Sequence, residues 1–277
     1  MDFETLLLDI TDGVATVTLN RPRQRNAMNP AFWREIRHVF ARINDDPSVR
    51  VAVIASTGPH FSAGLDLMSF GDILTPTEGD EGRRREALRR MILSLQECFT
   101  AIEQCRVPVL AAVQGGCIGG GVDLVTACDV RYCTEDAYFV IKEIDIGMTA
   151  DVGTLQRLPH LIPSGLMREL AYTGRDLSAA EAKTAGLVNT VFADAETMLT
   201  AVQDTARQIA AKSPLAITGT KEMINFTRDH SVADGLNYIA TWNAGMLISE
   251  DMIEAMGAAK TKRQPVFKDL DDTRDLA

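Results

Sequence analysis

The chain has 277 residues, of which 46% are hydrophobic, and its formal net charge is −10. That length allows one large domain or two small ones with a sizeable core. The acidic excess argues against nucleic acid or an anionic membrane surface as a partner. No apolar run approaches the roughly 20 residues that a membrane span needs. The start, MDFETLLLDITDG, lacks the profile of a signal peptide, so we expect a soluble cytoplasmic protein.

The cysteines predict no metal site. The sequence contains five, with no C-x-x-C pair and no Cys/His cluster at zinc-site spacing. We expect reduced, buried thiols that pack as small apolar side chains.

The first half of the chain alternates predicted strands and helices. Two largely apolar runs, Thr5–Ile10 and Val14–Leu19, flank Thr11-Asp12-Gly13 and predict a hairpin. Asn29-Pro30 predicts the start of a helix, with Asn as the cap and Pro at the first position. The continuous apolar run 51–55 predicts a strand buried on both faces.

The pattern changes further along the chain. Residues 81–104 have helical apolar spacing, 107–113 read as a second buried strand, and 187–192 as a later short strand. Such alternation favours an α/β fold with parallel pairing and helical crossovers. We therefore predict an α/β core at 1–195 that carries the functional site, followed by a helical region at 196–277.

A glycine cluster and three carboxylates indicate chemistry on a carbonyl compound. Gly119-Gly120-Gly121 directly precede an apolar helical run that carries Asp123. Glycines that open a helix expose backbone N–H groups at its positive end, which suits a developing oxyanion. Glu143 and Asp151 follow among apolar or small residues. Such surroundings raise a carboxyl pKa toward neutrality and suit proton transfer.

These motifs resemble the crotonase (enoyl-CoA hydratase/isomerase) superfamily. Its x-F-x-A-G-x-D loop is matched by HFSAGLDL at 60–67, and the glycine turn by 119–121. Within the superfamily the resemblance is closest to the Δ3,5-Δ2,4-dienoyl-CoA isomerases, whose three acidic positions fall on Asp123, Glu143 and Asp151. It extends to NRPRQRNAMNPAFW near the start and TRDHSVADGLNYIATWN near the end.

The resemblance implies a fold, a site and an assembly. The core would be a crotonase-like spiral of ββα units, and the oxyanion hole would use the N–H groups of Leu65 and Gly120. Substrate would be an acyl-CoA thioester; no cofactor and no metal would be needed, because coenzyme A is part of the substrate. The C-terminal helices would close the pocket and form a homotrimer or homohexamer. The implied substrate-binding residues are Ser62, Ala63, Gly64, Leu65, Asp66 and Gly120.

Each acid also has a plainer interpretation. Asp123 lies in a first helical turn, where carboxylates often only stabilise the helix dipole. Glu143 and Asp145 would share a strand face by two-residue alternation, and only the resemblance selects Glu143. Asp151 could cap a helix that begins near Val152, and Asp66 could cap the next helix while shaping the coenzyme pocket.

Two basic segments are candidates for the coenzyme phosphates. The run 83–85 with Arg89 and Arg90 reads chiefly as a solvated helix face. Arg23 and Arg25, in a loop rich in positive charge, are better placed by family analogy.

The implied reaction moves both double bonds of a 3,5-dienoyl thioester to give the 2,4 isomer, a step of fatty acid beta-oxidation. Glu143 would take a proton from carbon 2 and Asp151 would deliver one to carbon 6, although the opposite assignment is possible. Asp123 would hold the acid pair in the right protonation states. The alternatives are a 2-enoyl-CoA hydratase, in which Asp123 and Glu143 activate water, and a non-catalytic acyl-CoA- or RNA-binding homologue.

Overall fold

The computed structural model describes residues 3–70 and 80–272. A six-stranded sheet forms the centre, in the order β1-β2-β3-β4-β6-β9. The first pair is antiparallel and all the others are parallel. Its strands are β1 (Leu6–Thr11), β2 (Val14–Leu19), β3 (Val51–Ser56), β4 (Val109–Val113), β6 (Val130–Thr134) and β9 (Thr190–Phe192). The α/β prediction is confirmed.

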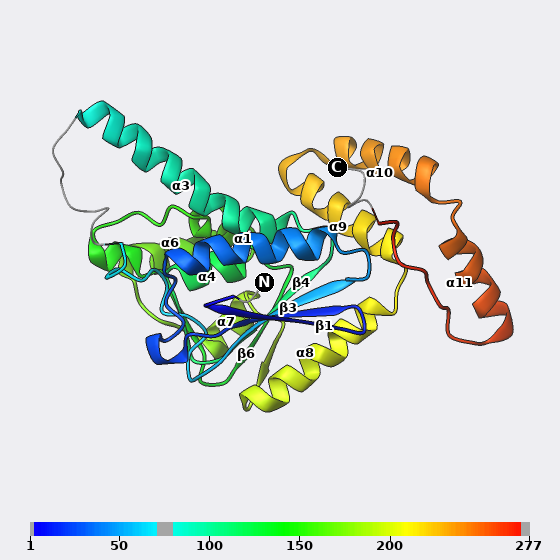
Figure 1. The fold of residues 1–277 in the computed structure, drawn as a ribbon, viewed down its shortest axis with the longest axis horizontal. Coiled ribbons are helices and arrows are strands. Elements are labelled where there is room, and N and C mark those ends of the chain that lie inside the picture. The colour runs from blue at the N-terminus through cyan, green and yellow to red at the C-terminus, as the bar shows by residue number, and fades with distance from the viewer. Residues whose placement is uncertain (1–2, 71–79, 273–277) are drawn as a thin grey trace.

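The central strands are buried because helices cover both faces of the sheet. All six residues of β3 and all five of β4 are buried, as expected for apolar strands sandwiched between layers. Figure 1 shows α1 (Pro30–Asp45) and α3 (Glu81–Glu103) above the sheet and α8 (Ala195–Ala210) below it. The predicted cap of α1 is present, since the Asn29 side chain accepts from the N–H of Phe32 at 3.0 Å.

A second, smaller sheet positions the glycine turn. It has the order β5-β7-β8, formed by β5 (Gly116–Ile118), β7 (Tyr138–Val140) and β8 (Leu177–Ser178). Strands β5 and β7 run parallel, and the Gly119 N–H continues their pairing by donating to Val140 at 2.8 Å. The chain then enters helix α4 (Gly120–Thr126).

The remaining helices are short elements around the two sheets and three longer helices at the end of the chain. The three longer helices extend away from the large sheet in Figure 1. In chain order, the remaining helices are η1 (Pro22–Gln24), η2 (Glu143–Ile146), α5 (Thr154–Arg157), η3 (Leu158–His160), α6 (Ser164–Thr173), α7 (Ala179–Ala185), α9 (Pro214–Asp229), α10 (Val232–Met246) and α11 (Glu250–Thr261).

Two strand predictions were too long, and the cysteines lie where expected. The run predicted at 107–113 is a strand only from Val109, and the run at 187–192 only from Thr190. Pro108 directly precedes β4. Because proline has no N–H to donate to a neighbouring strand, the strand begins after it. All five cysteines are buried and free.

Among residues 3–70 and 80–272, no helix is long and apolar enough to cross a membrane, and no group of His, Cys, Asp and Glu could hold a metal ion.

Candidate active site

Two backbone N–H groups, from Leu65 and Gly120, meet at the edge where the loop after β3 crosses the glycine turn. Leu65 forms a parallel bridge with Met28, through the Gly64 carbonyl and the Asp66 N–H. Because backbone groups alternate in direction along an extended chain, the N–H of Leu65 faces away from Met28. Gly120 is the first residue of α4, so its N–H has no partner inside the helix.

Gly64 is required for this close approach, and Gly120 leaves it open. Gly64 has φ +79°, and a methyl group there would lie 2.6 Å from the Ile118 oxygen and 3.1 Å from the Gly120 nitrogen. A methyl group on Gly120 would lie 3.8 Å from the Leu65 nitrogen. Two backbone N–H groups brought this close together would suit an oxyanion between them.

Asp123 is fully buried in the first turns of α4. Its Oδ1 accepts the Thr154 N–H at 2.6 Å, whereas its Oδ2 has no hydrogen-bond partner among the described residues. Burial raises the pKa of Asp123 to about 7; the bond from Thr154 opposes this, and the charges of Glu143 and Asp151 add to it. A carboxyl whose pKa is raised in this way suits proton transfer near neutral pH.

Glu143 does not lie on a strand, so the predicted sharing of a strand face with Asp145 is wrong. Strand β7 ends at Val140, and residues 143–146 form the 3-10 helix η2. With about three residues per turn, positions two apart point in different directions. Asp145 is exposed and pairs with Lys142 at 2.5 Å. Glu143 instead turns inward, and its Oε2 is buried without a partner in the described structure.

The Glu143 carboxylate lies against the glycine turn. A methyl group on Gly119 would come within 3.0 Å of its Oε1, so the absence of a side chain leaves room for the acid. Burial raises the pKa of Glu143, and the negative charge of Asp151 adds to the effect.

Asp151 is the third acid and does not cap a helix. Helix α5 begins at Thr154 with Gly153 at its cap position, so the capping interpretation is wrong. The Gln96 side chain from α3 donates to the Asp151 carbonyl at 2.6 Å and fixes the loop. Asp151 is half-buried, and burial raises its pKa.

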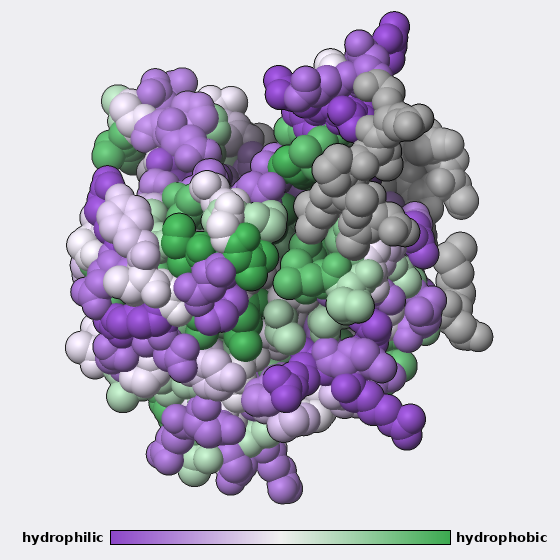
Figure 2. All heavy atoms as spheres, turned by 90° about the vertical axis from the view of Figure 1, so that its left-hand side faces the viewer, coloured by the Kyte–Doolittle hydropathy of each residue, from purple (hydrophilic) through white to green (hydrophobic). Residues whose placement is uncertain are grey.

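One pocket joins these groups. Its volume is about 110 Å³, and its lining combines the two N–H loops with all three acids and a set of apolar side chains. Figure 2, which looks onto the left-hand end of Figure 1, shows hydrophobic atoms gathered around a hollow with hydrophilic atoms outside it. The apolar lining residues are Trp33, Leu65, Leu67, Leu95, Ile146, Met148 and Val152.

Not every predicted binding residue reaches the pocket. Ala63, Gly64, Leu65 and Gly120 line it. Ser62 lies behind the loop, where its hydroxyl donates to Asn26 and accepts from the Gly64 N–H. Asp66 forms an ion pair with Arg21 at 3.2 Å, and its Oδ1 accepts the Ser69 N–H at 3.4 Å. Residues 67–70 form a turn, so the described residues contain no helix that Asp66 caps.

The basic segments lie on the surface. Arg23 and Arg25 are exposed beside the oxyanion loop, where the Ala63 N–H donates to the Arg25 carbonyl at 2.9 Å. The arginines at 83–85, 89 and 90 are exposed on α3, as predicted for a solvated helix face. Arg85 and Arg90 pair with Glu81 and Glu86 one turn earlier.

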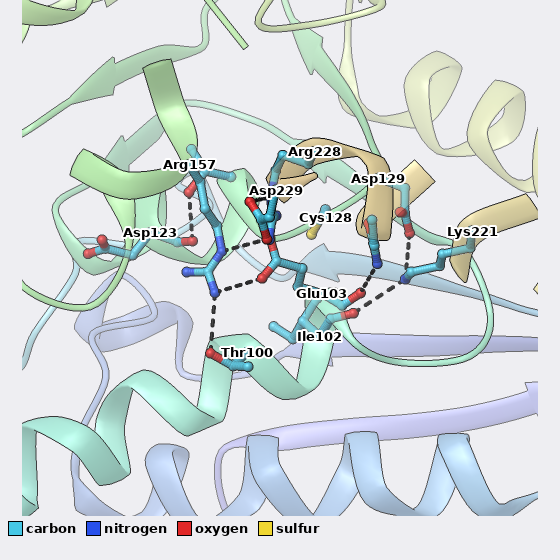
Figure 3. A network of polar contacts seen from close by, with 12 residues as sticks. Thr100, Ile102, Glu103, Asp123, Cys128, Asp129, Arg157, Lys221, Arg228 and Asp229 are labelled. Carbon is cyan, nitrogen blue, oxygen red and sulfur yellow. Dashed lines mark hydrogen bonds and ion pairs between the residues drawn. The ribbon is translucent and has the colours of Figure 1, made fainter. Parts of the chain in front are cut away.

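Three positioning residues escaped the sequence analysis. Thr154 holds Asp123, Gln96 holds the Asp151 loop, and Arg157 donates to the Val152 carbonyl at 3.4 Å and to both oxygens of Glu103. Figure 3 shows Arg157 between Asp123 and the Glu103–Arg228 pair. None of these residues stands in a glycine or carboxylate motif, so only their contacts reveal them.

The fold brings two backbone N–H groups and three carboxyls to one pocket, an arrangement typical of enzymes that move protons on carbonyl compounds. The family model for enoyl-CoA hydratase/isomerase matches residues 9–270. The chain therefore belongs to the enoyl-CoA hydratase/isomerase family.

Several relatives are more specific. The chain is 51% identical over 253 residues to "Delta(3,5)-Delta(2,4)-dienoyl-CoA isomerase, mitochondrial" of Pongo abelii, covering 91% of this chain and 77% of the relative. It is 46% identical over 269 residues to the peroxisomal protein of the same activity name from Arabidopsis thaliana, covering 96% and 97%. A crystal structure of an enoyl-CoA hydratase from Bacillus anthracis superimposes with a TM-score of 0.87 at 31% identity, covering 96% and 99%.

Proposed function

We propose that this chain isomerises 3,5-dienoyl-CoA to 2,4-dienoyl-CoA in fatty acid oxidation. The observation that carries the proposal is Asp151: a third carboxyl lines the same pocket as Asp123 and Glu143. A hydratase needs acids only near carbons 2 and 3, to which water adds. This isomerisation instead removes a proton from carbon 2 and adds one at carbon 6. The relatives named as dienoyl-CoA isomerases support the same reaction.

The reaction begins with the thioester oxygen between the N–H groups of Leu65 and Gly120. Each such donor contributes roughly 3–4 kcal/mol to stabilising the oxyanion in comparable acyl systems. Glu143 removes a proton from carbon 2, and the electrons of the broken C–H bond form an extended dienolate.

The second half-reaction places a proton on carbon 6. Asp151 donates it, the dienolate electrons form the new C–H bond, and both double bonds move by one position. Asp123 keeps the acids in complementary protonation states, because its charge is coupled to both of theirs. Raised pKa values allow an acid and a base to coexist near neutral pH.

The remaining parts of the proposal concern binding and assembly. Arg23 and Arg25 meet the coenzyme phosphates, and no separate cofactor takes part. The exposed apolar side chains of α10 and α11 pack between copies in a homotrimer or homohexamer. The cytoplasmic location stays a prediction from the sequence, since the names of the relatives include "mitochondrial" and "peroxisomal".

Matched substrates test the activity directly. A 2,4-dienoyl thioester is more conjugated than its 3,5 isomer, so ultraviolet absorbance follows the reaction. We expect turnover of a 3,5-dienoyl thioester to exceed hydration of a 2-enoyl thioester of equal length. Faster hydration would favour the 2-enoyl-CoA hydratase, and specific binding without turnover of either would favour a non-catalytic homologue.

A further inference from the structure

Asp151 lies between two cavities of opposite character. On one side is the apolar pocket with Glu143 and the N–H loops; on the other is a cavity of about 380 Å³ whose lining is mostly polar. Asp151 and Val152 line both. Asp123, by contrast, is fully buried and lines only the first of the two. The second cavity is also lined by Glu103, Gln156, Arg157, His160, Arg228 and Asp229.

The polar cavity reaches bulk solvent and has room for water. Gln156, His160 and Arg228 are exposed residues in its lining. A water molecule takes up about 30 Å³ in the liquid, so several fit at once. The cavity is therefore wet under ordinary conditions, while the neighbouring pocket is built for an acyl chain.

The fixed charges around this cavity are balanced and do not compete for protons. Arg157 pairs with Glu103 at 3.1 Å, and Arg228 bridges Glu103 and Asp229 (Figure 3). Burial alone would raise the pKa of Glu103, but the bonds from Arg157 and Arg228 outweigh it and lower that pKa. The bond from Arg228 likewise lowers the pKa of Asp229. Both acids stay ionised beside their arginines at neutral pH.

The proposed isomerisation leaves the acids in the wrong state after each turnover. Glu143 ends with the proton from carbon 2, and Asp151 ends ionised, having given its proton to carbon 6. Before the next cycle Glu143 must lose a proton and Asp151 must gain one. The proton either passes internally from Glu143 to Asp151 or is exchanged with solvent.

We propose that the polar cavity is the proton-exchange route of Asp151, through which solvent reprotonates this acid after each turnover. The proposal rests on the function proposed above and goes beyond it. Because Asp151 lines this cavity as well as the substrate pocket, recharging proceeds while product still fills the pocket. Glu143 discharges its proton into the substrate pocket once the product leaves.

Isotope labelling separates the two routes. The wild-type enzyme is given a 3,5-dienoyl thioester with deuterium at carbon 2, in ordinary water, at saturating concentration, and product is collected early. We expect the new hydrogen at carbon 6 to come from solvent. Transfer of deuterium from carbon 2 to carbon 6 over successive turnovers would overturn the proposal. Formation of the 2,4 isomer in the same sample reports separately on the proposed function.

A variant that narrows the cavity supplies the second measurement. Gln156→Phe places a bulky apolar ring at the lining, and Gln104→Phe makes the same change at an exposed position outside it. In Gln156→Phe we expect steady-state turnover to fall by at least about fivefold while the single-turnover rate stays at the wild-type value, because the resting enzyme already carries its proton. Gln104→Phe should keep both rates.

The two rates also distinguish a damaged site from a slowed recharge. A Gln156→Phe enzyme whose single-turnover and steady-state rates fall together has a disturbed catalytic geometry, and the proposed route is then wrong. Unchanged steady-state turnover in Gln156→Phe would overturn it equally.

Discussion

The α/β core and the C-terminal helices bury their apolar side chains to very different extents. In the core, β3 and β4 are buried throughout, and every residue that lines the candidate site comes from the core. On the C-terminal helices and the turn after α10, Leu236, Leu247 and Ile248 are 63%, 56% and 87% exposed. The core buries its apolar strands within one chain, whereas the C-terminal helices expose apolar surface of the kind that binds a partner. Changes in the core should therefore alter chemistry, and changes at the C-terminus should alter assembly.

The largest effect is expected at Glu143. Glu143→Gln removes the base that faces the pocket, and Asp145→Asn makes the same chemical change two residues away on the exposed side of η2. We expect Glu143→Gln to lower isomerisation by about 10²–10⁴-fold, the range that general acid–base groups supply. Asp145→Asn should leave the rate nearly unchanged. Equal losses in the two variants would contradict the assignment of Glu143.

Asp123 should have the next largest effect, on the pH dependence of stability. Its folded-state pKa is raised to about 7, so between pH about 4 and 7 the folded chain binds more protons than the unfolded chain, and its stability falls as pH rises. Asp123→Asn keeps the acceptor for Thr154 and removes the charge. We expect its free energy of unfolding to exceed the wild-type value by up to about 4 kcal/mol above pH 7.

Chemical denaturation at several pH values measures this difference. It should shrink as pH falls and vanish only below about pH 3, where the wild-type carboxyl is protonated in the folded and in the unfolded state. A difference in unfolding free energy that does not change with pH would mean that the folded-state pKa of Asp123 is not raised. As a control, the mass of the variant by light scattering should match that of the wild type at every pH.

Asp151 separates isomerisation from hydration. Asp151→Asn should lower dienoyl isomerisation by roughly 100-fold or more, because the group that protonates carbon 6 is lost. Any hydration of a 2-enoyl thioester should change far less, since Asp123 and Glu143 remain. A folded variant with the wild-type isomerisation rate would remove Asp151 from the mechanism.

Substitutions on the C-terminal helices should change the mass of the oligomer more than they change the reaction rate. We expect the wild-type protein to scatter light as a trimer or hexamer at micromolar concentration. The double variant Leu247→Glu, Ile248→Glu places two charges on the exposed apolar segment and should lower the mass by about threefold or more. Asn237→Glu adds a charge at an exposed polar position of α10 and should keep the mass. A monomeric wild type would refute the proposed assembly.

The smallest effect is expected at the basic loop. The double variant Arg23→Gln, Arg25→Gln should raise the Michaelis constant several-fold with turnover nearly unchanged, because the nucleotide is bound equally in the ground and transition states. The difference in Michaelis constant between the variant and the wild type should become smaller as added salt screens the charges. If the Michaelis constant keeps its wild-type value at low salt, the phosphates are held elsewhere.

The sequence alone determined the buried central strands, the cap of α1 and the chemical type of residues that the candidate site contains. Continuous apolar runs sufficed for β3 and β4, and Asn29-Pro30 sufficed for the start of α1, because local propensity and burial agree there. The glycine turn and the three acids could be predicted because their motifs are defined by residue types and their spacing along the chain.

Only the tertiary structure decided which acids meet and what surrounds them. The two-residue alternation of Glu143 and Asp145 was misleading, since the chain leaves the strand at Val140 and turns as a 3-10 helix. Thr154 and Gln96 reach their partners across 31 and 55 residues of sequence. The raised pKa values and the second cavity beside Asp151 depend on burial by distant segments, which no local pattern encodes.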